Sequence, residues 1–333
     1  MRNYSGALRK LKHLVSLSFT KLAVRDFYAE VSAVACGTQV HKHGIRPSDK
    51  TSGHMRRNIH RLEKGLIMPN RKEIFAEDYI EETVNLFTKA SSVRAFDQSE
   101  REWARDVLAE YFKHTKSTPK IEAAQKKYTE FERRAVSEEP SKRIPYLSSN
   151  RTKASVQEAD LEALFLERRS VRFFDDAKVP SEVIQRAVEL ASLAPSACNR
   201  QPFRFLAFSR ENRIRSLMKL PPGTRGFGSD VPNLIVAIGD LSCFSNPRDR
   251  HLIYTDTALA TMQLMLALQV LGVSSCPINW PDDAVREEKF RKEVAIKQHE
   301  RPIIYLAFGY PKDTGGIPFS QKKSVGSLLE LET

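Results

Sequence analysis

The longest apolar run of the chain, TALATMQLMLALQVLGV at 257–273, limits most strongly what the chain can fold into. Gln263 and Gln269 interrupt it, and it falls short of a membrane span. We therefore expect a helix over 254–272 that is buried nearly all round, and such a helix needs a second layer to cover it. Short β-rich runs can form that layer: FRFLAFS (203–209), NLIVAIG (233–239) and IIYLAFG (303–309). The C-terminal part is thus expected to be α+β, with a sheet packed against helices.

The chain divides into two regions of different character. Its 333 residues suffice for one large or two ordinary domains. Residues 1–150 are rich in charge and poor in β-type runs, and helical patterns cover roughly 5–35, 72–90, 97–115 and 120–138, with a loop over 41–54. The segment SEEPSKRIPYLSSNRTK (137–153) has linker composition. We expect a mainly helical N-terminal region at 1–150 and a second domain at 154–333, with helices at 156–167 and from Pro180 onward.

Composition narrows the class of protein. Hydrophobic residues make up 41% and charged residues 28%, as in soluble globular proteins. The net charge of +12 suits a partner with phosphate or carboxylate groups, but no RNP-like aromatics or zinc-finger spacing favour nucleic acid. The four cysteines form no CxxC pair, which indicates reduced thiols and a cytoplasmic setting. The basic N-terminus lacks a signal core, because LVSLSF is too short, and no membrane association is expected.

Two short motifs carry the functional signal. In LERRSVRFFDDAKVP (166–180), three arginines lie within five residues and Arg168, Ser170 and Arg172 recur at period two, so an extended backbone would turn all three to one side. Guanidinium groups suit a phosphate, although a solvated basic turn explains the segment equally well. In APSACNRQPFRF (194–205), a helix ends and a polar turn offers amide and backbone donors of the kind that fix a heteroaromatic ring. Taken alone, this second motif is more often an ordinary surface turn.

Together, in this order and spacing, the two motifs resemble the signature of the nitroreductase family of FMN-dependent oxidoreductases. The resemblance extends over roughly 160–330, including GVSSCPINW (272–280) and YLAFGYP (305–311), and leaves the first 150 residues outside. It implies an α+β fold with a central sheet flanked by helices, an intertwined homodimer, and two FMN molecules at the subunit interface. It also implies NAD(P)H as electron donor and a small-molecule electron acceptor.

The resemblance assigns flavin-binding roles residue by residue. The FMN phosphate would be bound by Arg168 and Ser170, with Arg169 beside them. Two basic residues late in the chain, Lys322 and Lys323, would complete the phosphate site. Arg172 would approach the N1/O2 side of the ring, where a positive charge stabilises the reduced, anionic flavin. The ring edge would be met from the opposite subunit by Pro195, Ser196, Ala197 and Asn199.

A third segment would lie over the flavin and donate a backbone N–H to its N5; it comprises Pro277, Asn279 and Trp280. Trp280 replaces a smaller residue of the family pattern, which would narrow the open face of the ring. Because the flavin carries the electron chemistry, no catalytic side chain is expected, and no convincing Ser-His-Asp or carboxylate pair is present.

The N-terminal region contains HMRRNIHRLEKGL (54–66), with His60, Glu63 and Lys64 at helical spacing. Six of the eight histidines precede the linker, but without paired cysteines or carboxylates they do not favour a metal site. A helical cap over the flavin pocket, a docking arm for a partner, and plain solvated charges all remain open.

Three functions fit the sequence. The first is an NAD(P)H-dependent FMN oxidoreductase that reduces nitroaromatics, quinones or another acceptor by ping-pong hydride transfer. The second is a dehydrogenase of the same fold acting on a biosynthetic intermediate. The third is a non-catalytic, flavin-free binding module, which the intact Arg168, Ser170 and Arg172 set disfavours.

Overall fold

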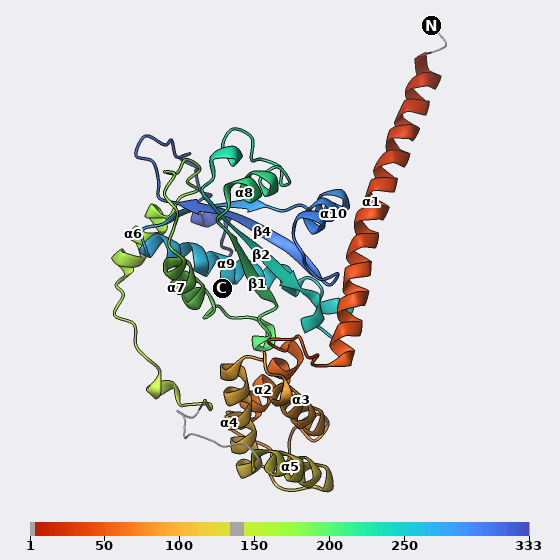
Figure 1. Ribbon diagram of the computed structural model, residues 1–333, viewed down its shortest axis with the longest axis vertical. Coiled ribbons are helices and arrows are strands. Elements are labelled where there is room, and N and C mark those ends of the chain that lie inside the picture. Colours follow the sequence, from red (N-terminus) through yellow and green to blue (C-terminus); the bar gives the residue numbers. More distant parts are fainter. Residues whose placement is uncertain (1–3, 134–142, 333) are drawn as a thin grey trace.

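The computed structural model describes residues 4–133 and 143–332, and the side chains of the first helix from residue 20 onward except residue 22. A long N-terminal helix runs along the side of an α+β unit, and a group of shorter helices lies at one end of that unit (Figure 1). Within the described residues, no helix is both long and apolar enough to cross a membrane.

Five helices precede the linker. They are α1 (Tyr4–His43), α2 (Gly53–Leu66), α3 (Ile80–Ser92), α4 (Gln98–His114) and α5 (Pro119–Glu132). Side-chain oxygens of Ser52, Asp97 and Thr118 accept hydrogen bonds from the first turns of α2, α4 and α5, which explains where these helices begin. Helices α2–α5 enclose their own apolar core, in which Ile59, Phe87 and Leu108 are fully or nearly fully buried. We call these four helices the helical unit.

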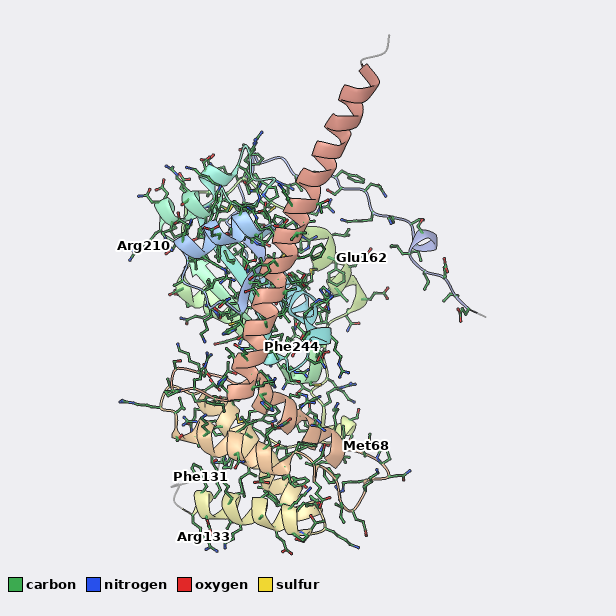
Figure 2. The ribbon with its side chains drawn as sticks, turned by 90° about the vertical axis from the view of Figure 1, so that its right-hand side faces the viewer. Met68, Phe131, Arg133, Glu162, Arg210 and Phe244 are labelled. Carbon is green, nitrogen blue, oxygen red and sulfur yellow. The ribbon has the colours of Figure 1, made fainter. Side chains whose placement is uncertain are left out.

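Helix α1 packs on the C-terminal part of the chain. Its Ala33 and Val34 join an apolar cluster with Leu241, Phe244 and Ile253, and Figure 2 shows Phe244 beside the helix. The helix then extends beyond the body of the protein (Figure 2). The first helix therefore ties the N-terminal region to the α+β unit.

Four strands form one antiparallel sheet in the order β1-β2-β4-β3. They are β1 (Phe203–Phe208), β2 (Asn233–Asp240), β3 (Ser274–Asn279) and β4 (Glu300–Gly309). Successive residues of the central strands point to opposite faces, and both faces are buried: Tyr305 lies in one core and Leu306 in the other. Such two-sided burial explains why β2 and β4 have nearly continuous apolar sequences rather than alternating ones.

Helices cover the two faces of the sheet. One face packs against α7 (Ser181–Ala191) and α9 (Leu252–Val270), and the other against α8 (Glu211–Leu217) and α10 (Ala284–Glu293). Helix α6 (Glu158–Glu167) contacts α9. Six short 3₁₀ helices complete the described segments: η1 (Ser148–Asn150), η2 (Ala197–Asn199), η3 (Gly228–Asp230), η4 (Leu241–Cys243), η5 (Pro247–Asp249) and η6 (Val325–Ser327).

The predicted α+β class, the buried helix near 254–272 and three of the strands are confirmed. The expectation that this helix is buried nearly all round is wrong: Leu259, Met262 and Val270 are exposed. They lie on the side of α9 turned away from the sheet, where the described residues leave them exposed. The helix expected at 72–90 begins only at Ile80, and strand β3 was not recognised as a strand. The division at 150 and 154 stays a prediction, and part of the linker (134–142) lies outside the described residues.

Beyond β4 the chain forms a C-terminal tail (311–332) whose residues are exposed apart from a half-buried Gly315. Large apolar side chains are among them: Ile317, Phe319, Val325, Leu328, Leu329 and Leu331. Figure 2 shows the tail leaving the body of the protein. Among the described residues, nothing covers these apolar side chains.

The docking of α1 depends on one glycine. A Cβ atom at Gly37 would lie 2.8 Å from the backbone carbon of Leu241. We expect Gly37→Ala to destabilise the protein by about 1–3 kcal/mol through this overlap. At a helical position with free space around it, the same change raises the free energy of unfolding by about 1 kcal/mol. Urea unfolding therefore distinguishes the two situations by the sign of the change in that free energy. A stabilised variant would show that α1 does not pack here in solution.

Candidate functional site

The arginine segment 168–172 follows α6, whose C-cap is Arg168. It lies beside the start of β3: Ser170 forms a parallel bridge with Ser275, and the Val171 N–H donates to the Ser275 carbonyl at 3.2 Å. The structure therefore brings together two of the predicted flavin-binding segments, 168–172 and 277–280. The Ser275 hydroxyl next to them is buried and has no hydrogen-bond partner.

The three arginines of this segment are half-buried. No carboxylate oxygen of the described residues lies within 4.0 Å of any of them. Arg172 donates to the Ser170 carbonyl at 3.1 Å, and its guanidinium carbon lies 5.9 Å from the centre of the Phe227 ring. Arg169 donates to the Pro318 carbonyl at 3.1 Å and to the Phe319 carbonyl. Three guanidinium groups without a counter-charge have the chemistry that a phosphate requires, so the donor set fits FMN.

The end of β3 presents alternate residues to opposite sides. Pro277 and Asn279 are exposed, whereas Trp280 is buried. The indole of Trp280 stacks on Tyr305 with ring centres 5.1 Å apart and planes 6° apart. The expectation that this side chain narrows the open face of a flavin is therefore not met, because it fills the core under the sheet instead.

The polar turn between α7 and β1 has an uncommon backbone. Cys198, Asn199 and Gln201 all have φ near +50° (53°, 51° and 48°), a left-handed conformation that side chains disfavour. Several contacts hold it: Ser196 Oγ accepts from the Gln201 N–H at 3.0 Å, and Asp256 of α9 accepts from the Ala197 N–H at 3.1 Å. Burial raises the pKa of Asp256, while the Ala197 N–H and Arg200 oppose the shift. A strained turn that the surrounding structure over-determines is typical of binding sites.

The helical unit holds the same turn. Arg56 of α2 donates from Nε to the Asn199 carbonyl at 2.8 Å, and its Nη1 lies 3.0 Å from Glu100 Oε2. Glu100 is buried, and burial raises its pKa against the opposing effect of Arg56. Of the roles left open for the N-terminal region, a cap on this side of the fold is favoured, because α2 touches the turn directly.

The structure does not bring the other predicted site residues into contact with one another. Among the described residues, no hydrogen bond, ion pair or ring contact joins the turn 195–201 to the segment 168–172. Lys322 and Lys323 are exposed in the tail, which approaches Arg169 only through Pro318 and Phe319. Within one chain the turn 195–201 and the arginine segment thus make no direct polar or ring contact.

Sequence reasoning missed several residues that shape this region: Arg56, Glu100, Arg200, Phe227 and Asp256. One of them had a readable signal, because Asp256 is a lone carboxylate inside the most apolar helix. Glu100 and Phe227 had none, since each acts through a contact with a segment far away in the sequence.

Two histidines meet where α1 approaches the helical unit. The rings of His41 and His54 stack with centres 4.2 Å apart, and His41 Nδ1 donates to the Ser242 carbonyl at 2.9 Å. Burial, followed by repulsion from His54, lowers the pKa of His41 to about 4. In the described ranges, no group of three or more His, Cys, Asp or Glu side chains able to hold a metal ion occurs.

Comparisons with known proteins agree on the C-terminal part. The family model described as Nitroreductase family matches residues 165–223 and 219–310. A protein of Archaeoglobus fulgidus assigned as an NADH dehydrogenase/NAD(P)H nitroreductase is 32% identical over 152 residues, covering 44% of this chain and 82% of that protein. An iodotyrosine deiodinase of Haliscomenobacter hydrossis is 25% identical over 199 residues, covering 49% of this chain and 84% of that protein.

Solved structures are similar over the same part. A crystal structure from Parabacteroides distasonis with the same assignment as the Archaeoglobus protein has 25% identity and a TM-score of 0.46, covering 53% of this chain and 99% of that one. An FMN-dependent nitroreductase of Clostridium difficile has 21% identity and a TM-score of 0.40, covering 50% of this chain and 93% of that one.

The buried His41 makes stability depend on pH. Because its folded-state pKa is about 4 and the unfolded value is 6.5, only the unfolded chain binds this proton between those values. Stability is therefore lost as the pH falls from 6.5 to 4, by about 2 kcal/mol between pH 7.5 and pH 5. We expect His41→Asn, which retains a donor near Nδ1, to lose that part of the pH dependence in urea unfolding. His43→Asn, on the exposed side of α1, should keep the parent profile; identical slopes for both variants would contradict the assignment.

Proposed function

The chain belongs to the nitroreductase family, and from that premise we propose that it is an FMN-dependent oxidoreductase. It transfers hydride from NAD(P)H to a nitroaromatic, a quinone or another small-molecule acceptor by a ping-pong mechanism. The observation that carries the proposal is the arginine segment. Three half-buried guanidinium groups without a carboxylate partner lie beside β3, within the residues that the family model matches.

In the proposed site, Arg168, Arg169 and Ser170 bind the FMN phosphate, and Lys322 and Lys323 of the tail add positive charge. Arg172 lies two residues further along the same extended segment and faces the pyrimidine side of the ring, where it stabilises negative charge. Exposed Pro277 and Asn279 border the ring at the end of β3. When bound, FMN supplies the hydride-accepting and hydride-donating chemistry.

The proposed enzyme is a homodimer, and each turn 195–201 serves the flavin of the other subunit. Two features support this arrangement. The turn and the arginine segment do not meet within one chain, and an apolar surface on α6, α9 and the tail has no cover. That surface includes Leu161, Phe165, Leu166, Leu259, Met262 and Phe319. Exposed apolar area of this extent is typical of a subunit interface.

In such a dimer the helical unit lies next to the site. Arg56 connects α2 to the carbonyl of Asn199, so movement of the helical unit would move the turn 195–201. We propose that this unit caps the site and limits which acceptors reach it. A flavin-free binding module explains the structure less well, because it leaves the three arginines without a counter-charge among the described residues.

Substitutions at Arg168 and Arg172 test the proposed cofactor site. A charge-assisted hydrogen bond contributes roughly 1.5–3 kcal/mol, so Arg168→Ala should weaken FMN binding about ten- to a hundredfold. Arg172→Ala should slow flavin reduction by NAD(P)H and lower the flavin potential, because the reduced form loses its counter-charge. Arg186→Ala, at an exposed ion pair on α7, serves as control. FMN titration and stopped-flow reduction measure both effects, and two variants that behave like the control would exclude this site.

A charge on the exposed side of α9 tests the dimer. We expect Met262→Glu to yield a monomer in analytical ultracentrifugation and to lose FMN together with the dimer, because the ring-edge turn of the second subunit is removed. Lys289→Glu, exposed on α10, should stay dimeric and yellow. A Met262→Glu monomer that binds FMN as tightly as the parent would refute the shared site.

A further inference from the structure

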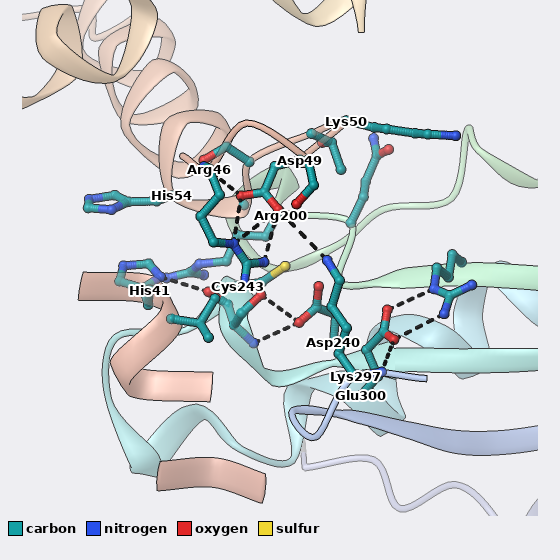
Figure 3. Close-up of a pocket in the computed structure, with 18 of the residues that line it drawn as sticks. His41, Arg46, Asp49, Lys50, His54, Arg200, Asp240, Cys243, Lys297 and Glu300 are labelled. Carbon is teal, nitrogen blue, oxygen red and sulfur yellow. Dashed lines mark hydrogen bonds and ion pairs between the residues drawn. The ribbon is translucent and has the colours of Figure 1, made fainter. Parts of the chain in front are cut away.

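A cavity of about 390 Å³ lies where the helical unit meets the α+β unit (Figure 3). The end of α1, the loop before α2, the start of β1 and η4 surround it, and we call it the seam cavity. None of the residues of the arginine segment 168–172 lines it. Its volume falls in the usual range for small-molecule sites, about 300–1,000 Å³.

Arg200 lines the seam cavity and carries a buried charge without a counter-ion. Arg200 is only 6% exposed. Nη1 donates to the Ala197 carbonyl at 3.1 Å, and the buried Nε has no partner. The guanidinium carbon lies 5.1 Å from the centre of the Phe244 ring, but no carboxylate oxygen of the described residues comes within 4.0 Å. A buried charge is normally paired, since the loss of its hydration is otherwise uncompensated.

The carboxylates around the cavity are already engaged. Asp49 pairs with Arg46 at 2.9 Å, and Glu300 binds Arg204 through both oxygens at 2.8 and 3.0 Å. Asp240 accepts from His299 at 2.8 Å. Figure 3 shows the Arg46–Asp49 pair and Glu300 on the wall of the cavity. Asp256 of α9 feels the charge of Arg200 but lies outside the cavity lining, and no carboxylate that lines the cavity forms an ion pair with Arg200.

Further positive charge surrounds Arg200. Burial lowers the pKa of the Arg57 guanidinium on α2, and repulsion from Arg61 and Arg200 lowers it further. Among the described residues, the one hydrogen bond from the Arg57 side chain goes to the neighbouring Asn58 amide oxygen, at 3.2 Å. Arg57 does not line the cavity, but it adds positive charge next to Arg200.

We propose that the seam cavity binds a small molecule through an oxyanion, a phosphate or a carboxylate, that pairs with the Arg200 guanidinium. This site is additional to the proposed flavin site, although Arg200 and Gln201 belong to the turn 195–201 that we assign to the flavin of the other subunit. A ligand in the seam cavity contacts the helical unit and the turn 195–201 at the same time, because Arg200 hydrogen-bonds to the Ala197 carbonyl of that turn. Binding therefore stabilises the contact between the two units.

The test uses the full chain with Arg168→Ala, so that phosphate at the proposed flavin site makes no contribution. Thermal unfolding is followed with increasing inorganic phosphate, and separately with acetate, at constant ionic strength set by sodium chloride. We expect a saturable rise of Tm with at least one of the two anions, which also tells a phosphate from a carboxylate ligand. Adding Arg200→Met should weaken that anion's binding more than tenfold. Because it removes an uncompensated buried charge, it should also leave the anion-free protein at least as stable as before.

Arg204→Met is the matched control, since Arg204 lines the same cavity but is paired with Glu300. It should keep the anion-dependent rise. The proposal is overturned if neither anion raises Tm, or if the rise survives Arg200→Met. Destabilisation by Arg200→Met with an unchanged rise would mean that the guanidinium only supports the turn. If Arg200→Met does not fold, Arg200→Gln, which keeps a hydrogen-bond donor for the Ala197 carbonyl, decides: weaker anion binding supports the site, and unchanged binding excludes it.

Discussion

Both faces of β2 and β4 are buried, and the other elements of the α+β unit follow from this constraint. A strand buried on both sides needs a helical layer above and below, here α7 and α9 on one face and α8 and α10 on the other. The helix that covers most of one face, α9, must be apolar toward the sheet. Its far side is also apolar and stays uncovered in one chain, which is the physical basis for proposing a dimer.

The two units of the chain meet at a strained turn rather than at a broad apolar surface. Arg56 from the helical unit and Asp256 from α9 hold the backbone at Asn199 and Ala197 from opposite directions. Three residues of this turn, Cys198, Asn199 and Gln201, lie in the left-handed region, and contacts from both units hold the turn that contains them. A change in the helical unit therefore reaches the turn without passing through the sheet.

Two buried arginines of this protein show opposite electrostatic situations. Arg301 on β4 places Nε and Nη2 at 3.0 and 2.8 Å from one oxygen of Glu287, and its Nη1 donates to the Tyr254 hydroxyl at 2.8 Å. Arg200 is almost as buried but has only a carbonyl and an aromatic ring. The first charge is balanced within the fold, whereas the second forms no ion pair with a described carboxylate, which is the basis for proposing an anion beside it.

Sequence alone determined the α+β class, the long apolar helix and the three strands richest in β-branched and aromatic residues, because periodicity and composition act locally. It also located the arginine segment, since spacing along an extended backbone is a local property. It did not reveal β3, whose proline and serines are weak strand formers and which is fixed by pairing with β4. Nor could it place Trp280 in the core or find the partners of Arg200. Tertiary structure decided these points, because burial and the absence of a counter-charge depend on segments far apart in the chain.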